Sequence, residues 1–255
     1  MHESLRVGTA LLLALLGTTA CGPASRERLP DALERQILVS AAASLTDAFG
    51  AIEQAFEAAN PGVDLVLNLA ASSTLREQIL EGAPVDVFAP ASESMMQEVV
   101  AAGRVGGSPV LFAGNSLEIA VPAGNPAGIT GLGDLARTEL AIGLCAEAVP
   151  CGGYAREALR RAGVQPAIDT NEANVRALLT KIELGEIDAG IVYASDVESA
   201  RVDGLPIPDE YNVTVGYLIA QLTDAPHPHA AAALLAFLLG AEGRAILAEH
   251  GLTVP

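Results

Sequence analysis

The stretch Ala41-Ala42-Ala43-Ser44-Leu45-Thr46-Asp47 decides which fold the chain can adopt. It follows an apolar run at residues 37–39 and leads into apolar residues spaced three or four apart, namely Leu45, Phe49, Ile52, Phe56 and Ala59. This order predicts a strand, a loop of small residues and an amphipathic helix. At the helix N-terminus, unpaired backbone N–H groups, the helix dipole and a hydroxyl can together bind an anion. Alternatively, Ser44 or Thr46 only caps the helix.

The same pattern recurs further along the chain. Residues 63–69 predict a second strand, and Ala71-Ser72-Ser73-Thr74 then opens a second helix. Residues 85–89 and 93–102 predict a further strand and helix. Strands that alternate with helices are typical of a doubly wound, mostly parallel sheet, whose ligands lie at the carboxyl ends of the strands. Both serine loops fall at such ends.

A similar alternation returns after residue 140, with strands predicted at 140–144 and 189–193 and helices at 154–162 and 175–184. Two similar halves predict an α/β protein with two lobes and a cleft between them. We expect residues 37–117 with 218–255 to form lobe 1, and residues 118–217 to form lobe 2. The C-terminal helices predicted at 230–239 and 242–250 are thus expected to return to lobe 1.

The N-terminal residues have the features of an export signal. Arg6 precedes the apolar run 7–16, and small residues lead to Cys21, so residues 1–20 are predicted to be a signal peptide. The position of Cys21 resembles a bacterial lipoprotein signal, which implies that Cys21 carries the lipid and residues 21–36 form a tether. The expected location is periplasmic or the outer face of the cytoplasmic membrane. The alternative is a secreted protein without lipid.

Charge and composition narrow the possible partners. The formal net charge is −17, which argues against binding to nucleic acid or to an anionic membrane surface. The apolar run at 230–239 has about half of the roughly 20 residues that a membrane-spanning helix needs. We expect a monomer.

Two features leave alternatives open. Cys145 and Cys151 remain as an even pair once Cys21 is assigned to lipid, which favours a disulfide over two free thiols in an oxidising compartment. His227-Pro228-His229 could bind a metal, but two histidines that flank a proline in a polar loop more often form a turn.

Seven short motifs resemble one known family. They occur in the family's order between residue 37 and residue 255: Ala41-Ala42-Ala43-Ser44-Leu45-Thr46, Ala71-Ser72-Ser73-Thr74-Leu75, Gly82-Ala83-Pro84-Val85-Asp86-Val87-Phe88, Gly114-Asn115-Ser116-Leu117, Val149-Pro150-Cys151-Gly152, Val175-Arg176 and Gly190-Ile191-Val192-Tyr193-Ala194-Ser195-Asp196. They look like the molybdate-binding proteins (ModA-type) of bacterial ABC importers. The resemblance implies a two-lobed type II periplasmic-binding-protein fold that closes on one tetrahedral dianion.

The resemblance also implies a ligand and its donors. The ligand would be molybdate or tungstate, delivered to an ABC permease, with no cofactor, no catalysis and molybdenum present only within the oxyanion. The implied donors are the hydroxyl and N–H groups of Ser44 and Ser72, the N–H groups of Cys151 and Val175, and the hydroxyl of Tyr193. The family often has alanine where this chain has Cys151, a change that a backbone donor tolerates.

Several alternatives to this interpretation stay open. The ligand could be sulfate or another oxyanion, Ser72 and Ser73 could simply cap their helix, and Tyr193 could be a core residue. Three arginines could touch or steer the anion or could lie on solvated helix faces: Arg76, Arg156 and Arg176.

Two other functional classes fit the sequence less well than a binding protein does. A hydrolase using Ser44 is disfavoured because there is no Gly-x-Ser-x-Gly motif. The histidines also lie far from the loops in sequence, at His2, His227, His229 and His250. A cytoplasmic sensing module of the same fold is disfavoured by the signal sequence.

Overall fold

The computed structural model describes residues 36–255. The predicted signal peptide, the lipid site at Cys21 and all but the last residue of the predicted tether lie outside the described residues.

The first of two five-stranded sheets has the strand order β2-β1-β3-β10-β4. Its strands are β1 (Gln36–Ala42), β2 (Asp64–Ala70), β3 (Val87–Ala89), β4 (Val110–Asn115) and β10 (Val215–Gln221). Strand β1 pairs in parallel with β2 and β3, whereas β10 runs antiparallel to both β3 and β4. Four of the five strands therefore point in one direction, and β10 opposes them.

The second sheet repeats this topology in the order β7-β6-β8-β5-β9. Its strands are β5 (Leu117–Pro122), β6 (Ile142–Cys145), β7 (Ile168–Glu172), β8 (Ala189–Tyr193) and β9 (Val202–Pro206). Strand β6 pairs in parallel with β7 and β8, and β5 runs antiparallel to β8 and β9. The predicted pair of mostly parallel α/β halves is confirmed, with one reversed strand in each sheet that the sequence pattern did not reveal.

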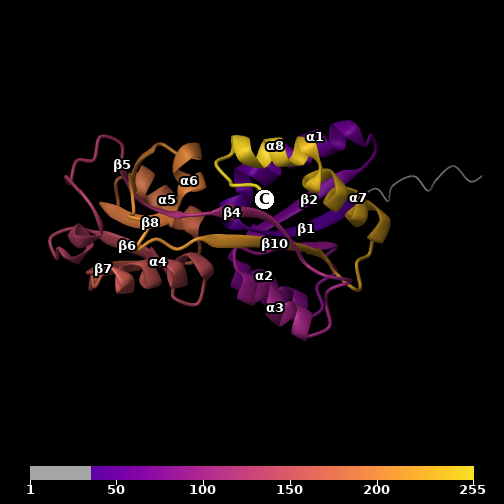
Figure 1. Ribbon diagram of the computed structural model, residues 1–255, viewed down its shortest axis with the longest axis horizontal. Coiled ribbons are helices and arrows are strands. Elements are labelled where there is room, and N and C mark those ends of the chain that lie inside the picture. The colour runs from indigo at the N-terminus through magenta and orange to yellow at the C-terminus, as the bar shows by residue number, and fades with distance from the viewer. Residues whose placement is uncertain (1–35) are drawn as a thin grey trace, which may run out of the picture. The chain divides into compact units, whose positions relative to one another are not determined.

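The chain passes between the two sheets twice, directly after β4 and again between β9 and β10 (Figure 1). Strand β10 begins at Val215 in the first sheet, so the second crossing comes before the predicted boundary at 217/218. The division of the chain into the two stated residue sets stays a prediction.

Helices cover both faces of the first sheet. Strand β3 shows this directly, because Val87 and Ala89 belong to one core cluster and Phe88, which points the opposite way, belongs to another. The larger cluster includes apolar residues of α1 (Thr46–Ala59), α7 (Pro228–Leu239) and α8 (Ala241–Glu249). The smaller cluster includes residues of α2 (Ser72–Leu80) and α3 (Glu93–Ala101), which lie across the sheet from α1 and α8 (Figure 1).

The second sheet carries α4 (Pro150–Arg161), α5 (Val175–Glu183) and α6 (Ala194–Ser199). Two short 3-10 helices, Ala43–Leu45 and Leu132–Ala136, complete the helical segments of residues 36–255. Within that range no single helix is long and apolar enough to cross a membrane; only α7 and α8 together meet this test, as a pair bent by 64°.

Candidate anion-binding site

One cavity lies where helices from both sheets begin. It encloses about 220 Å³, its mouth included, and thirteen residues line it: Ala42, Ala43, Ser44, Ala70, Ala71, Ser72, Ala91, Val149, Pro150, Cys151, Asn174, Val175 and Tyr193. All five residues implied by the family resemblance are in this set. None of the thirteen has a charged side chain, so hydroxyl, amide and backbone groups supply the polarity of the cavity.

Four helix N-termini contribute these backbone groups. Ser44 lies in the 3-10 turn that leads into α1, Ser72 and Val175 are the first residues of α2 and α5, and Cys151 is the second residue of α4. N–H groups in the first turn of a helix have no acceptor within that helix. Pro150 precedes Cys151 and has no N–H, so Cys151 provides the first donor of α4. The four helix starts therefore present donors and positive dipole ends to one cavity.

The serine hydroxyls do not cap their helices. Neither α1 nor α2 has a side-chain cap. Ser44 Oγ lies 2.9 Å from the hydroxyl of Tyr217, and Ser72 Oγ accepts the N–H of Ala91 at 3.0 Å. Because Ser72 Oγ acts as an acceptor there, its own hydrogen is available to the cavity. Ser73 does not line the cavity.

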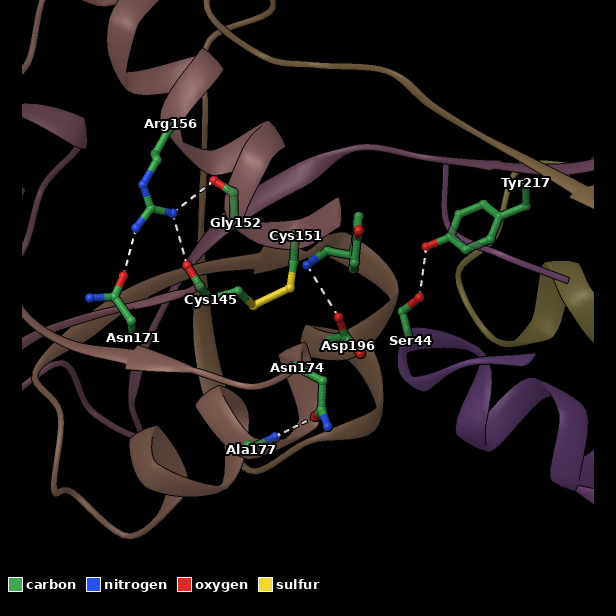
Figure 2. Close-up of a disulfide and its surroundings, with 11 residues drawn as sticks. Ser44, Cys145, Cys151, Gly152, Arg156, Asn171, Asn174, Ala177, Asp196 and Tyr217 are labelled. Atoms are coloured by element: carbon green, nitrogen blue, oxygen red, sulfur yellow. Dashed lines mark hydrogen bonds between the residues drawn. A yellow bond between two sulfur atoms is a disulfide. The ribbon is translucent and has the colours of Figure 1, made fainter. Parts of the chain in front are cut away.

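Asn174 caps helix α5. The Oδ1 atom of Asn174 accepts the N–H of Ala177 at 3.0 Å (Figure 2). This bond satisfies the third N–H of the helix and leaves the first, that of Val175, without a partner among residues 36–255.

Tyr193, at the end of β8, is both a core residue and a cavity residue. Its side chain is 2 % exposed, and its ring meets the ring of Tyr217 edge to face with centroids 6.2 Å apart. Burial raises the pKa of both tyrosines well above the usual range, so their hydroxyls stay protonated.

A disulfide and an arginine hold the loop in front of α4. Cys145 and Cys151 are bonded, with their Cα atoms 5.8 Å apart. Arg156 donates to the carbonyls of Cys145 and Gly152 at 2.8 and 3.0 Å, and to Asn171 Oδ1 at 2.6 Å (Figure 2). The loop that presents Cys151 is thus held by the disulfide and by two hydrogen bonds from Arg156, whose third bond, to Asn171, ties the arginine to β7.

The three arginines near the donor loops do not line the cavity. Arg156 makes the loop contacts just described. Arg76 pairs with Glu98 at 2.9 Å, and Arg176 pairs with Asp47 at 2.9 Å. The charges of Arg76 and Arg176 are therefore paired with carboxylates, whereas Arg156 donates to neutral oxygens.

A neighbouring groove brings His250 nearer to Ser44 than the sequence indicated. Ser44, Asp47, Glu198 and His250 all line this groove. No hydrogen bond within residues 36–255 joins His250 to Ser44, whose Oγ instead contacts Tyr217. The arrangement therefore lacks the hydrogen-bonded base that an activated serine requires.

The histidine pair belongs to a helix start. His227 donates its backbone N–H to Asp86 Oδ1 at 2.6 Å, its Nδ1 lies 3.2 Å from Asp86 Oδ2, and Pro228 begins α7. Among the described residues, no three histidine, cysteine or acidic side chains are grouped to hold a metal ion.

Asp196 is a buried carboxyl group next to Tyr193. It is 1 % exposed, its Oδ2 accepts the N–H of Tyr193 at 3.2 Å, and its Oδ1 has no hydrogen bond. Burial raises the pKa of Asp196 to about 7 from 3.8, and Arg176, with Nη1 3.8 Å from Oδ1, partly opposes this shift.

This raised pKa predicts a pH dependence of stability. Between about pH 4 and pH 7 the folded state binds more protons at Asp196 than the unfolded state, so its contribution to the free energy of unfolding falls as pH rises. Asp196→Asn keeps an acceptor for Tyr193 N–H and removes the buried charge. We expect the variant to be about 1–3 kcal/mol more stable than the unsubstituted protein at pH 8, with little difference at pH 4. Urea unfolding at both pH values measures this, and parallel pH profiles would contradict it.

Known proteins share this fold and family. Residues 37–253 match the family model of the bacterial extracellular solute-binding proteins. The molybdate-binding protein ModA of Mycobacterium tuberculosis is 38 % identical over 256 residues, which cover 98 % of each chain. A putative ABC transporter substrate-binding lipoprotein of Bacillus subtilis, YvgL, is 27 % identical over 99 % of each chain.

A solved structure has the same fold. The periplasmic molybdate-binding protein of Azotobacter vinelandii superposes with a TM-score of 0.76 at 20 % identity, covering 87 % of this chain and 100 % of that protein. The family model spans most of the chain, and the mycobacterial relative spans nearly all of it. The chain therefore belongs to the family of bacterial extracellular solute-binding proteins.

Proposed function

We propose that this protein captures molybdate, and also tungstate, in the cavity between its two sheets and delivers it to an ABC permease. The observation that carries this proposal is the composition of the cavity. Four helix starts, two serine hydroxyls and a tyrosine hydroxyl meet there, and no charged side chain lines it. The name of the mycobacterial relative, which covers nearly the whole chain, supports molybdate as the ligand.

In this proposal the oxyanion is held by neutral donors. Ser44 and Ser72 donate hydroxyl and N–H hydrogens, Cys151 and Val175 donate N–H hydrogens, and Tyr193 donates its hydroxyl hydrogen. Removing water from a dianion is costly unless other donors replace it. Hydrogen bonds to a charged oxygen are short and strong, and donors fixed in advance lose little freedom on binding. The site binds and releases the anion without changing it chemically.

The proposed location follows from the sequence and the family. Residues 1–20 would be removed on export, and lipid on Cys21 would keep the protein at the outer face of the cytoplasmic membrane. The name of the Bacillus relative, a substrate-binding lipoprotein of an ABC transporter, supports both the anchor and the permease. The protein would act as a monomer whose lobes close on the anion.

A panel of anions tests the ligand. At about a thousand times its dissociation constant, a ligand adds about 4 kcal/mol to the free energy of unfolding. For a protein of this size, that raises the melting temperature by about 8 to 16 °C. We expect such a rise with molybdate and with tungstate, and a much smaller one with sulfate or phosphate. Equal rises with sulfate would change the proposal to a general carrier of tetrahedral dianions, and no rise with any anion would overturn it.

Two neighbouring serines show whether the anion occupies this cavity. Ser72 lines it and Ser73 does not. Ser72→Ala should therefore reduce the molybdate-induced rise, whereas Ser73→Ala should leave the rise unchanged. Equal effects of the two substitutions would place the anion elsewhere.

A further inference from the structure

The hydroxyl of Ser44 is hydrogen-bonded to a buried polar network outside the cavity. The hydroxyl of Tyr217 lies 2.9 Å from Ser44 Oγ, and Asn115 Nδ2 lies 3.4 Å from the same hydroxyl (Figure 2 shows the Tyr217–Ser44 contact). Tyr217 is fully buried and Asn115 is 4 % exposed. Neither residue lines the cavity, so neither can touch an anion bound there.

The orientation of the Asn115 amide is fixed by the backbone. Asn115 Oδ1 accepts the N–H of Ser116 at 2.9 Å, which identifies the other terminal atom as the NH₂ group. That group donates to Ser195 Oγ at 2.8 Å and to the Tyr217 hydroxyl. The Tyr217 oxygen is therefore an acceptor toward Asn115.

The direction of the last hydrogen bond then follows by elimination. Among residues 36–255 the Tyr217 hydroxyl has two partners, Asn115 Nδ2 and Ser44 Oγ, and the first is a donor. A buried hydroxyl hydrogen without an acceptor is costly, so Tyr217 donates to Ser44 Oγ. Ser44 then accepts from Tyr217, and its own hydrogen is left to point into the cavity.

We propose that Tyr217 is a positioning residue that fixes the Ser44 hydroxyl as a hydrogen donor toward the bound anion. The chain of bonds runs from Asn115 through Tyr217 to Ser44, and each donor polarises the next. Without the Tyr217 hydroxyl, Ser44 loses its fixed partner and its hydroxyl can rotate away from the cavity. This inference rests on the proposed function only in assuming that a tetrahedral dianion binds in the cavity.

The network also joins the two sheets at the crossings of the chain. Asn115 ends β4, Tyr217 lies in β10, and Ser195 lies in α6 beside the second sheet. The bond from Asn115 to Ser195 thus connects the two halves directly behind Ser44. The orientation of Ser44 accordingly depends on groups from both halves.

Tyr217→Phe tests the proposal because it removes one oxygen atom and keeps the ring contacts with Phe112 and Tyr193. We expect the variant to bind the dianion about tenfold more weakly by titration calorimetry, the loss of part of one charge-assisted hydrogen bond. Tyr211→Phe is the matched control, because Tyr211 lines neither the cavity nor the groove beside it, and it should bind as the unsubstituted protein does. An affinity of Tyr217→Phe within about twofold of the unsubstituted protein would overturn the proposal.

A double-mutant cycle separates positioning from general damage to the fold. If Tyr217 acts through Ser44, Tyr217→Phe has no further effect on affinity once Ser44→Ala is present. A tenfold loss that persists in the Ser44→Ala background would overturn the proposal, because Tyr217 would then act by another route. The cycle is measured with molybdate or, if the unsubstituted protein binds only sulfate, with sulfate. An error in the proposed ligand therefore does not hide an error in the proposed role of Tyr217. Binding of neither anion would overturn both proposals.

Discussion

Replacing Val175 by proline is expected to weaken oxyanion binding by about 10- to 100-fold while leaving the fold intact. Val175 is the first residue of α5, where proline is favoured because its fixed φ suits the helix and its missing N–H has no intrahelical partner. The preceding residue, Asn174, has φ −160° and ψ 173°, an extended conformation that a following proline tolerates. The substitution therefore removes one backbone donor from the cavity, and because Val175 is 2 % exposed and belongs to the core, it also replaces one buried apolar side chain by another of similar size.

Proline at the start of another helix is the control. Glu93 is the first residue of α3, follows Ser92 in an extended conformation and does not line the cavity. We expect Glu93→Pro to keep the anion affinity measured by titration calorimetry. Without ligand, Glu93→Pro should melt close to the unsubstituted protein because Glu93 is exposed, and Val175→Pro should melt lower because it changes a buried side chain. Unchanged affinity in Val175→Pro would mean that the N–H of Val175 does not contact the anion.

Local patterns predicted the elements that carry most of the site. Strand β1 and helix α1 follow from an apolar run and from apolar residues three and four apart, and helices α2 and α5 begin at residues 72 and 175. These predictions succeeded because each depends on residues within one element. Predicted helix 154–162 begins earlier, at Pro150, because proline is favoured at a first position, the disulfide holds Cys151 and Arg156 bonds to the carbonyl of Gly152.

Contacts between distant residues could not be predicted in the same way. Tyr217 is 173 residues from Ser44 in sequence, and only the pairing of β10 between β3 and β4 brings the two together. Strands β4 and β9 were missed as well, because their sequences show no clear alternation and their positions depend on β10 and β5. The sequence also left open whether Cys145 and Cys151 are bonded, since that depends on their separation in space.

Two adjacent glycines in α4 are expected to respond in opposite directions to the same substitution. A Cβ atom on Gly152 would lie 1.9 Å from the carbonyl oxygen of Ala146 and 2.6 Å from that of Cys145. Both are backbone atoms of the loop that Arg156 and the disulfide hold in place, so neither can turn aside as a flexible side chain would. A Cβ atom on Gly153 would have room, because the nearest atom to its position, the carbonyl oxygen of Glu147, is 3.8 Å away.

Gly152→Ala must therefore push the start of α4 away from the loop, and we expect a loss of about 3 kcal/mol or more of stability, as severe overpacking causes. Because Cys151 is its neighbour, the donor N–H of Cys151 moves with it, and anion binding should weaken in the same variant. Gly153→Ala should instead gain up to about 1 kcal/mol, since alanine favours the helix over glycine. Urea unfolding and calorimetric titration of both variants measure the difference. If Gly152→Ala were as stable as Gly153→Ala and bound the anion equally well, this prediction would be wrong. The position of Cys151 would then not depend on the close packing of α4 against its loop.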